Sequence, residues 1–372
     1  MTFNLTEEQQ EMAGAVAAFL DKRSPESEVR RLMEDGGAPD PAVWAQMAGQ
    51  LGLTGLIVPE QYGGAGFGFL DFALVAERTG AALLVAPLLS TVCAASAVML
   101  STDEDLKSAY LAGLASGEQI GTLALAERSG SWDIAATEMS ADVGADGRTT
   151  LSGAKMYVTD GEQADIFIVS ARSPVGSVGL YVVEANSPAV SVTALSTLDM
   201  TRPQAVVEFA DATARPLTDD ANSTAVIERV MATAAIMLAA EQVGGAQRCL
   251  DMAVEYAKIR VQFGRPIGSF QAIKHKCADM LLDVESARSA AYYAASVLDD
   301  DNESTLVAAA LAKAHCSSAY TRVAAENIQI HGGIGFTWEH SAHLYFKRAK
   351  TSEILFGDPA WQRERLADLV GI

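Results

Sequence analysis

The chain has 372 residues, of which 49% are hydrophobic and 20% charged, and its formal net charge is −20. This length predicts two or three domains, and the composition excludes general disorder. The excess of negative charge argues against nucleic acid and against an anionic membrane surface, because both need Lys and Arg to neutralise phosphates. An anionic cofactor can still bind where the few Lys and Arg converge.

No segment of the chain predicts a disulfide framework, a targeting peptide or a membrane span. The four cysteines are widely spaced without a CxxC pair, which is typical of isolated thiols in a reducing cytoplasm. The start MTFNLTEEQQ is polar and acidic, unlike a signal or transit peptide. Residues 80–100 are uncharged and long enough to span a bilayer, but Pro87 favours two short core helices that break before it. We therefore expect a cytoplasmic protein.

The first third of the chain has a helical pattern. Thr6, followed by Glu7 and Glu8 and then by apolar residues at helical spacing, predicts a capped amphipathic helix. Residues 41–51 predict another helix, and the glycines of PEQYGGAGFG at 59–68 indicate a loop.

The middle of the chain changes to the pattern of strands. Short apolar or alternating runs, rich in Val, Ile, Thr and Tyr, are separated by Gly, Asp, Ser and Pro. They cover residues 118–127, 150–159, 164–171, 178–184 and 204–210.

After Pro216 the pattern returns to long helices. Residues 223–259 form one apolar-faced run, and a second helix repeats apolar residues from Phe270 to Val284. The sequence thus predicts an α+β protein with an all-α domain at 1–117, a β domain at 118–216 and a helical domain at 217–372.

A basic corner is predicted at YAKIRVQFGRPIGSFQAIKH, residues 256–275. Arg260 and Arg265 lie there, between two helices of an otherwise acidic chain. A guanidinium at such a corner suits bidentate contact with a phosphate. A helical corner with solvated arginines fits the spacing equally well.

A glycine-rich stretch, IQIHGGIGFTWEH, follows at residues 328–340. Gly332 and Gly333 let the backbone approach a ligand closely, while Gln329 and His331 offer polar contacts. The stretch matches neither the Rossmann nor the P-loop template. No carboxylate or cysteine cluster completes a ligand set with the histidines, so we expect no metal.

Together these stretches resemble the acyl-CoA dehydrogenase family over essentially the whole chain. The matching segments, in order, are PEQYGGAG at 59–66, LALAERSGSWD at 123–133, KMYVT at 155–159, RVQFGRPIGSFQ at 260–271, QIHGGIGF at 329–336 and RAK at 348–350. The resemblance implies a helical domain, a middle β-barrel or sandwich domain and a C-terminal four-helix bundle. It also implies a tetrameric FAD flavoprotein of lipid metabolism. Such an oxidoreductase of β-oxidation dehydrogenates an acyl-CoA thioester and passes electrons to an electron-transferring flavoprotein.

The resemblance assigns cofactor contacts to both corners. Arg260 matches the arginine that binds the pyrophosphate of a neighbouring subunit's FAD, and Phe263 would stack nearby. Gln329, Gly332 and Gly333 match the residues that hold the adenine half across the same interface. This half of the family's FAD site is intact.

The half of the site that lines the flavin within one chain is retained only in part. Tyr157 and Thr159 match the family's aromatic residue and threonine. The family's TEP triplet, however, has Ala126 for its Thr and Arg128 for its Pro, and the Ser of its GSD motif is Trp132.

The two positions where the family carries its catalytic glutamate hold residues that cannot accept a proton. The EGT position is Phe356, and the alternative position on the long helix is Ala234. Glu241 is a candidate for a relocated base because it lies two turns further along the same helix face. That offset is about 10 Å, however, and a helix-interior Glu often bonds a buried Arg. Glu353 and Asp358 flank the vacant position and are weaker candidates.

Three functional hypotheses follow. In the first, the chain is the base-lacking subunit of a hetero-oligomer, completing the FAD site of a homologous partner that acts on fatty-acid or bulky steroid side-chain thioesters. In the second, it is a self-sufficient homo-oligomeric dehydrogenase that uses Glu241. In the third, it is a non-redox binding or assembly protein. The surviving cross-interface half of the FAD site favours the first hypothesis.

Overall fold

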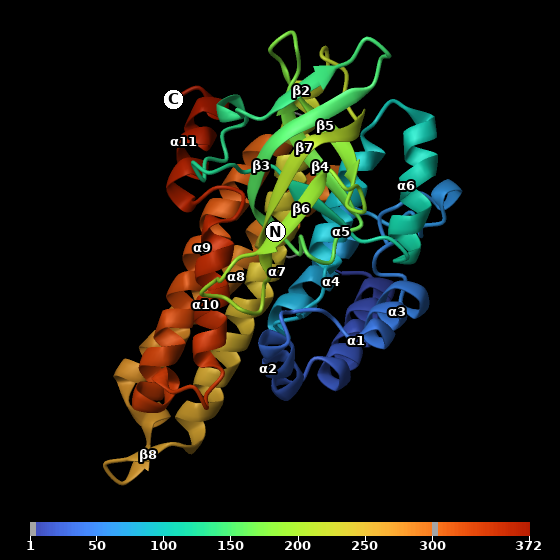
Figure 1. The fold of residues 1–372 in the computed structure, drawn as a ribbon. Coiled ribbons are helices and arrows are strands. Elements are labelled where there is room, and N and C mark those ends of the chain that lie inside the picture. Colours follow the sequence, from blue (N-terminus) through green and yellow to red (C-terminus); the bar gives the residue numbers. More distant parts are fainter. Residues whose placement is uncertain (1–4, 300–303) are drawn as a thin grey trace. The chain divides into compact units, whose positions relative to one another are not determined.

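The computed structural model describes residues 5–299 and 304–372. The chain forms two compact units, each built from separate segments. One unit comprises Met1–Arg31, Phe69–Leu84 and Ala235–Ile372, and the other comprises Leu32–Gly68 and Val85–Ala234. Figure 1 shows the elements in chain order.

The first part of the chain is helical, as predicted. Its helices are α1 (Glu7–Arg23), α2 (Glu26–Glu34), α3 (Pro41–Ala45), η1 (Gln46–Gln50), η2 (Glu60–Tyr62), α4 (Phe69–Ala81), α5 (Leu88–Met99) and α6 (Glu104–Ser116). The predicted cap of α1 is confirmed: Thr6 Oγ1 accepts from Gln9 N, and Gln9 Oε1 accepts from Thr6 N, both at 3.1 Å. The break before Pro87 is also confirmed, because α4 ends at Ala81 and α5 begins at Leu88.

The middle of the chain forms one sheet. Its strands are β1 (Gly121–Ala124), β2 (Ser140–Val143), β3 (Thr149–Thr159), β4 (Ile166–Arg172), β5 (Val178–Glu184), β6 (Val190–Ala194) and β7 (Gln204–Pro216), with a short helix η3 (Ile134–Ala136) before β2. Pairings β2–β3, β3–β7, β7–β5, β5–β4 and β4–β2 close a ring, so the sheet is barrel-like. β1 adds to β4 in parallel, and β6 adds to β7 in antiparallel.

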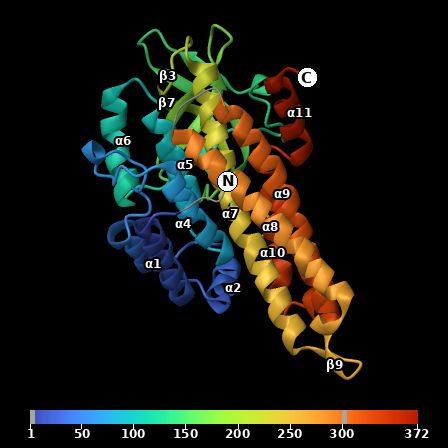
Figure 2. The same cartoon turned by 180° about the vertical axis from the view of Figure 1, so that it is seen from behind.

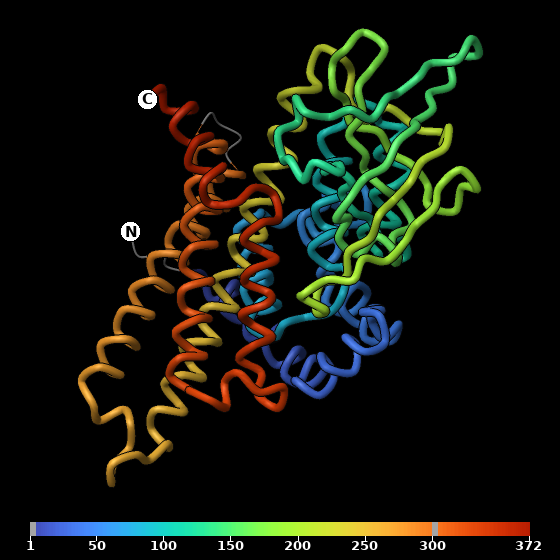
Figure 3. The backbone as a smooth tube through the Cα atoms, turned by 60° about the vertical axis from the view of Figure 1, so that its left-hand side comes forward, coloured from blue at the N-terminus to red at the C-terminus, as the bar shows by residue number. Residues whose placement is uncertain are grey.

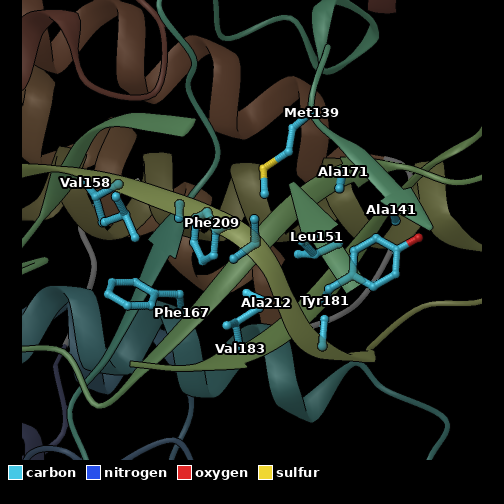
Figure 4. Packing of buried hydrophobic residues seen from close by; sticks show 14 of the residues in the cluster. Met139, Ala141, Leu151, Val158, Phe167, Ala171, Tyr181, Val183, Phe209 and Ala212 are labelled. Atoms are coloured by element: carbon cyan, nitrogen blue, oxygen red, sulfur yellow. The ribbon is translucent and has the colours of Figure 1, made fainter. Parts of the chain in front are cut away.

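The inward faces of the strands form the core of the β region (Figure 4). Phe167 on β4 and Phe209 on β7 meet edge to face, with ring centroids 6.1 Å apart. Leu151, Met139 and Tyr181 fill the same interior. The alternation of apolar and polar residues along β3 and β7 places one side of each strand in this core.

The last part of the chain is helical again. Its elements are α7 (Ser223–Ile259), β8 (Val261–Gln262), β9 (Arg265–Pro266), η4 (Ile267–Ser269), α8 (Gln271–Asp299), α9 (Ser304–His331), η5 (Gly332–Phe336), α10 (Ala342–Ile354) and α11 (Pro359–Val370). α9 packs against α8, α10 and α11. Figures 2 and 3 show the long helices α8 and α9 side by side, and the β8–β9 hairpin at the far end of α7 and α8.

Glycines allow α4 and α7 to cross at close range within one unit. A Cβ added at Gly80 would lie 1.9 Å from Glu241 O, and one at Gly244 would lie 1.8 Å from Glu77 O. Among the described residues, α7 is the one helix that is long and apolar enough to cross a bilayer. However, 72% of its most apolar 18-residue window is buried within the protein. That burial is expected of a core helix.

The strand and helix predictions were incomplete, since α2, α6, α9, α10 and α11 received no bounds of their own. β2 and β6 were not predicted, and residues 41–51 form α3 followed by the wider turn η1 instead of one helix. The division into three domains, with boundaries at 117/118 and 216/217, remains a prediction. Secondary structure changes from helix to strand between Ser116 and Gly121, and back to helix between Pro216 and Ser223.

Candidate functional site

The basic corner is a tight hairpin at the end of α7. β8 pairs with β9 through Val261–Pro266 and Gln262–Arg265. Phe263 and Gly264 turn the chain with φ of 53° and 76°, as a two-residue hairpin with right-handed strand twist requires. The Phe263 side chain is 91% exposed. The predicted basic corner therefore presents an aromatic ring at its tip.

Arg260 lies at the base of this hairpin with an exposed side chain. Its backbone N–H donates to Tyr256 O at 2.8 Å and so continues the last turn of α7. Within residues 5–299 and 304–372, its guanidinium makes no hydrogen bond or ion pair. Nothing in this part of the chain therefore competes with an external anion for Arg260.

The glycine-rich corner lies next to the basic one. The Tyr256 ring, one turn before Arg260, stacks on the His331 ring with centroids 4.3 Å apart. His331 ends α9, so Gln329 and Gly332 lie at the same end of the helical bundle as Arg260. Gln329 is exposed. The structure thus brings together the two segments that the sequence predicted to share one ligand.

The backbone at Gly332 and Gly333 is open. A Cβ built on either residue meets no heavy atom within 4 Å. Gly332 has φ of 64°, which explains its identity by backbone conformation, but Gly333 has no positive φ. Neither conformation nor packing in the described chain requires glycine at 333. A ligand or partner approaching the backbone closely would require it.

His331 is also stacked on His340, with ring centroids 4.3 Å apart. Burial lowers the pKa of both imidazoles. His331 Nδ1 is 2.8 Å from Asn327 O, which fixes its ring. No group of His, Cys, Asp and Glu in the described segments has the arrangement of a metal site.

Tyr157 and Thr159 lie on β3 in the other unit. A register shift between Lys155 and Val158 gives Tyr157 a φ of 56° and leaves its side chain 41% exposed. Thr159 Oγ1 is buried and has no hydrogen-bond partner. A buried hydroxyl without a partner costs free energy, so this position fits a polar ligand atom such as those at a flavin edge.

The substituted segment beside β3 is held by hydrogen bonds of Glu127 and lines a small crevice. Glu127 accepts from Lys155 Nζ at 2.7 Å and from Met139 N at 3.1 Å. Burial lowers the pKa of Lys155 to about 8, while Glu127 acts in the opposite direction. Trp132 helps to line a crevice of about 10 Å³, the space of about one water molecule. The sequence did not predict the Glu127–Lys155 pair.

Neither vacant base position is compensated locally. Ala234 and Phe356 are both buried apolar residues. Phe356 has φ of 59°, in the left-handed region, and its carbonyl accepts from Gln362 Nε2 at 2.7 Å. Asp358 accepts from two backbone N–H groups at the start of α11, and Glu353 pairs with Lys350. Both flanking carboxylates therefore have structural roles.

Glu241 is paired with a buried arginine. Arg348 Nη1 donates to Glu241 Oε1 at 2.9 Å, and the two side chains are 3% and 7% exposed. Arg348 Nη2 also lies 3.4 Å from Leu84 O. A carboxylate held in such an ion pair is stabilised in its charged form. This pairing argues against Glu241 as a base, although its role remains a prediction.

A buried lysine holds the loop that carries Phe356. Lys313 is completely buried on α9, and its Nζ donates to Ser317 Oγ at 2.9 Å, Gly357 O at 3.0 Å and Glu353 O at 3.1 Å. Burial lowers its pKa to about 7. Lys313 was not predicted from the sequence, where its only signal is a lysine within the mostly apolar run 306–316.

Two family models match most of the chain. The N-terminal domain of acyl-CoA dehydrogenase matches residues 6–118, and the C-terminal domain matches residues 224–371. The chain belongs to the acyl-CoA dehydrogenase family. Its helical, β and helical regions are the fold of that family, so the predicted fold class is confirmed. Members of the family include oxidoreductases of fatty-acid and steroid β-oxidation.

Similar proteins cover the chain from end to end. Acyl-CoA dehydrogenase IpdE2 of Mycobacterium tuberculosis is 37% identical over 360 residues, covering 97% of this chain and 96% of that protein. The butyryl-CoA dehydrogenase of Megasphaera elsdenii is 28% identical, with a TM-score of 0.91 and 100% of both chains covered. A chain of the ChsE4–ChsE5 complex from Mycobacterium tuberculosis is 30% identical, with a TM-score of 0.91 over 100% of this chain and 99% of that one. Homologues and solved structures of this family are FAD-dependent.

Proposed function

We propose that this acyl-CoA dehydrogenase family member is the base-lacking subunit of a hetero-oligomer. It would complete the FAD site of a homologous partner, which supplies the catalytic carboxylate. The observation that carries the proposal is the open backbone at Gly333 beside the exposed Arg260. The described chain offers no reason for glycine at 333, and no partner for the Arg260 guanidinium.

Dehydrogenation of a thioester sets the chemical requirement. The proton on the carbon next to the thioester is weakly acidic, so a carboxylate must lie against it in a dry site. When bound, FAD supplies the acceptor for the hydride. This chain has Ala234 and Phe356 at the family's base positions, and Glu241 is already paired with Arg348. Removal of the proton is therefore assigned to the partner.

The residues of this chain would bind and orient the cofactor. Arg260 would pair with the pyrophosphate, since a guanidinium and a phosphate form charge-assisted hydrogen bonds. Gln329 and the backbone at Gly332 and Gly333 would hold the adenine half, and Phe263 would stack beside it. Tyr157 and Thr159 remain candidate flavin contacts of a second, eroded site within this chain.

The substrate class is an acyl-CoA thioester of fatty-acid or steroid side-chain β-oxidation. Electrons would pass to an electron-transferring flavoprotein. The likeness to a chain of the ChsE4–ChsE5 complex supports an assembly of two different homologous subunits. The similarity to acyl-CoA dehydrogenase IpdE2 extends over 97% of this chain, and this supports an acyl-CoA thioester as the substrate.

The test is the flavin spectrum of the chain, purified alone and after co-expression with candidate homologous subunits from the same genome. The proposal predicts a colourless chain alone and a yellow complex that is bleached by acyl-CoA. A yellow chain that binds about one FAD by itself and is bleached by acyl-CoA would instead establish a self-sufficient enzyme. Failure to bind FAD in either preparation would leave a non-redox binding or assembly role.

A further inference from the structure

A second candidate site lies within the unit that contains the helical bundle, and it shares no residue with the cofactor corner, that is, the basic and glycine-rich corners together (Arg260, Phe263, Gln329, Gly332 and Gly333). It is a cavity of about 320 Å³ between α1, α2, the end of α4, α7 and α10. This volume is at the lower end of the range for small-molecule sites, about 300–1,000 Å³. Any ligand here is therefore small.

The wall of the cavity formed by residues 81–83 is held in a fixed conformation. Ala81 O accepts from Tyr345 Oη at 2.7 Å, and Ala82 O accepts from Ser24 Oγ at 3.2 Å. Leu83, the next lining residue, has φ of 47°, a left-handed conformation that is unfavourable for leucine. Strain of this kind persists where the surroundings fix the backbone, and it is concentrated at binding sites.

Two arginines line the same cavity. Arg248 lies beside the Tyr345 hydroxyl, which itself donates to Ala81 O at 2.7 Å. Arg78 has a buried Nε without a hydrogen-bond partner, and among the described residues its guanidinium has no ion pair. A guanidinium that is partly removed from water without a partner is costly, and an anion in the cavity would provide the missing partner.

The charges around the cavity select for a single negative charge. Two carboxylates, Asp21 and Glu26, also line it. Glu26 is paired with Arg30 at 2.8 Å, so it does not compensate the cavity arginines. Asp21 offsets one of the two guanidiniums and leaves about one positive charge. A polyanion such as a nucleotide carries more negative charge than this balance compensates, and Asp21 would repel it.

The rest of the lining is apolar. Leu20, Val29, Leu83 and Leu344 are buried residues that contribute to the wall. Such a wall favours a ligand whose body is hydrophobic, because the buried apolar area stabilises the complex. A hydrated inorganic anion would leave this surface without a partner.

We propose that this cavity binds a small monocarboxylate with a compact apolar body. The carboxylate would accept hydrogen bonds from the guanidiniums of Arg78 and Arg248. The alkyl or aryl body would pack on Leu20, Val29 and Leu344. The inference does not depend on the proposed function, since none of these residues belongs to the cofactor corner or to the base positions.

Isothermal titration of the purified full chain with hexanoate, and separately with inorganic phosphate at equal ionic strength, tests the site. We expect saturable 1:1 binding of hexanoate and no saturable binding of phosphate. Arg78→Gln should weaken hexanoate binding by about 10–100-fold, as expected for a lost charge-assisted hydrogen bond. The matched control is Arg148→Gln, which removes a guanidinium that is 64% exposed in the β region.

A second variant keeps the test decisive if Arg78→Gln does not fold. Ala17→Phe adds a ring from the apolar side of the cavity without changing charge, and it should also abolish binding. Circular dichroism and thermal unfolding establish that each variant is folded. The proposal is overturned if hexanoate does not saturate, if phosphate alone binds, or if both cavity variants bind hexanoate like the control.

Discussion

The ion pair between Glu241 and Arg348 argues against a relocated base, and a substitution of Glu241 tests this. Glu241→Gln would leave Arg348 buried without its countercharge, and we expect a loss of about 3–5 kcal/mol in the free energy of unfolding. Urea unfolding of the purified chain measures this change. The double variant Glu241→Met, Arg348→Met should recover most of the loss, because it removes both charges together.

The opposite outcome would support the hypothesis of a self-sufficient homo-oligomeric dehydrogenase that uses Glu241 as its base. If Glu241 is the base, Glu241→Gln should leave the stability nearly unchanged and abolish turnover in a flavin-loaded sample. Stability and turnover of this one variant therefore separate a structural carboxylate from a catalytic one.

Lys313 predicts a pH dependence of stability. Burial lowers its pKa from 10.5 to about 7, so between these values the unfolded chain holds a proton that the folded chain has released. The contribution of Lys313 to the free energy of unfolding therefore rises with pH from about 7 to about 10, and it is least favourable below pH 7. Wild-type protein should gain stability relative to Lys313→Met as pH increases across this window.

Urea unfolding of both proteins at several pH values within the window measures the difference. Subtracting the free energy of unfolding of Lys313→Met from that of the wild type cancels the contributions of the other titrating groups, which the two proteins share. The control is Lys107→Met, which removes an ammonium that is 2.8 Å from Glu104 on the surface of α6. A flat difference for Lys313→Met, or one that falls with pH, would contradict the prediction.

At the scale of elements, the crossing of α4 and α7 depends on glycine. Gly244→Ala should lower the free energy of unfolding by about 1–3 kcal/mol or more, because the added Cβ would overlap Glu77 O at 1.8 Å. Gly14→Ala in α1 is the matched control, since nothing lies within 4 Å of its Cβ. That change should stabilise the protein by about 0.5–1 kcal/mol through the helix propensity of alanine. Thermal unfolding compares the two, and equal effects would refute the close crossing.

The elements differ in how far the sequence predicts them. Residues 223–259 and 178–184 were predicted with the bounds that α7 and β5 have, because their apolar patterns are long or uninterrupted. β2 and β6 have four and five residues and are mostly exposed. Their pairings to β3 and β7 hold them in place, and no local pattern marks such short strands.

In the candidate site, too, the sequence indicates residues that lie in local motifs but not contacts between distant segments. The family resemblance implied that Arg260, Gln329 and the glycines share one ligand, and in the structure they lie at the same end of the bundle, while their role as cofactor contacts remains a prediction. Arg348, by contrast, lies 107 residues from Glu241 in the sequence. Such a pair follows from tertiary packing alone, and only the structure shows it.

For the whole molecule, the proposed function makes this chain an incomplete enzyme whose exposed corner acts on a partner's cofactor. The corner protrudes beyond the last turn of α7, with Phe263 91% exposed and Arg260 exposed at its base. Substitutions there should alter flavin binding in the complex without altering the folding of the chain. This expectation distinguishes a donated site from a packing motif.

Arg260→Ala tests that distinction in the co-expressed complex. We expect about 10–100-fold weaker FAD binding, because a phosphate loses its charge-assisted hydrogen bonds while the FAD keeps its other contacts. Flavin absorbance after dialysis measures retention, and urea unfolding of the variant alone should match that of the wild type. Arg265→Ala is the matched control, because Arg265 lies in the same hairpin but stacks over Phe270 at 4.1 Å. Equal flavin retention in the two variants would mean that Arg260 only shapes the corner, and the missing carboxylate would then have to be explained without a shared cofactor site.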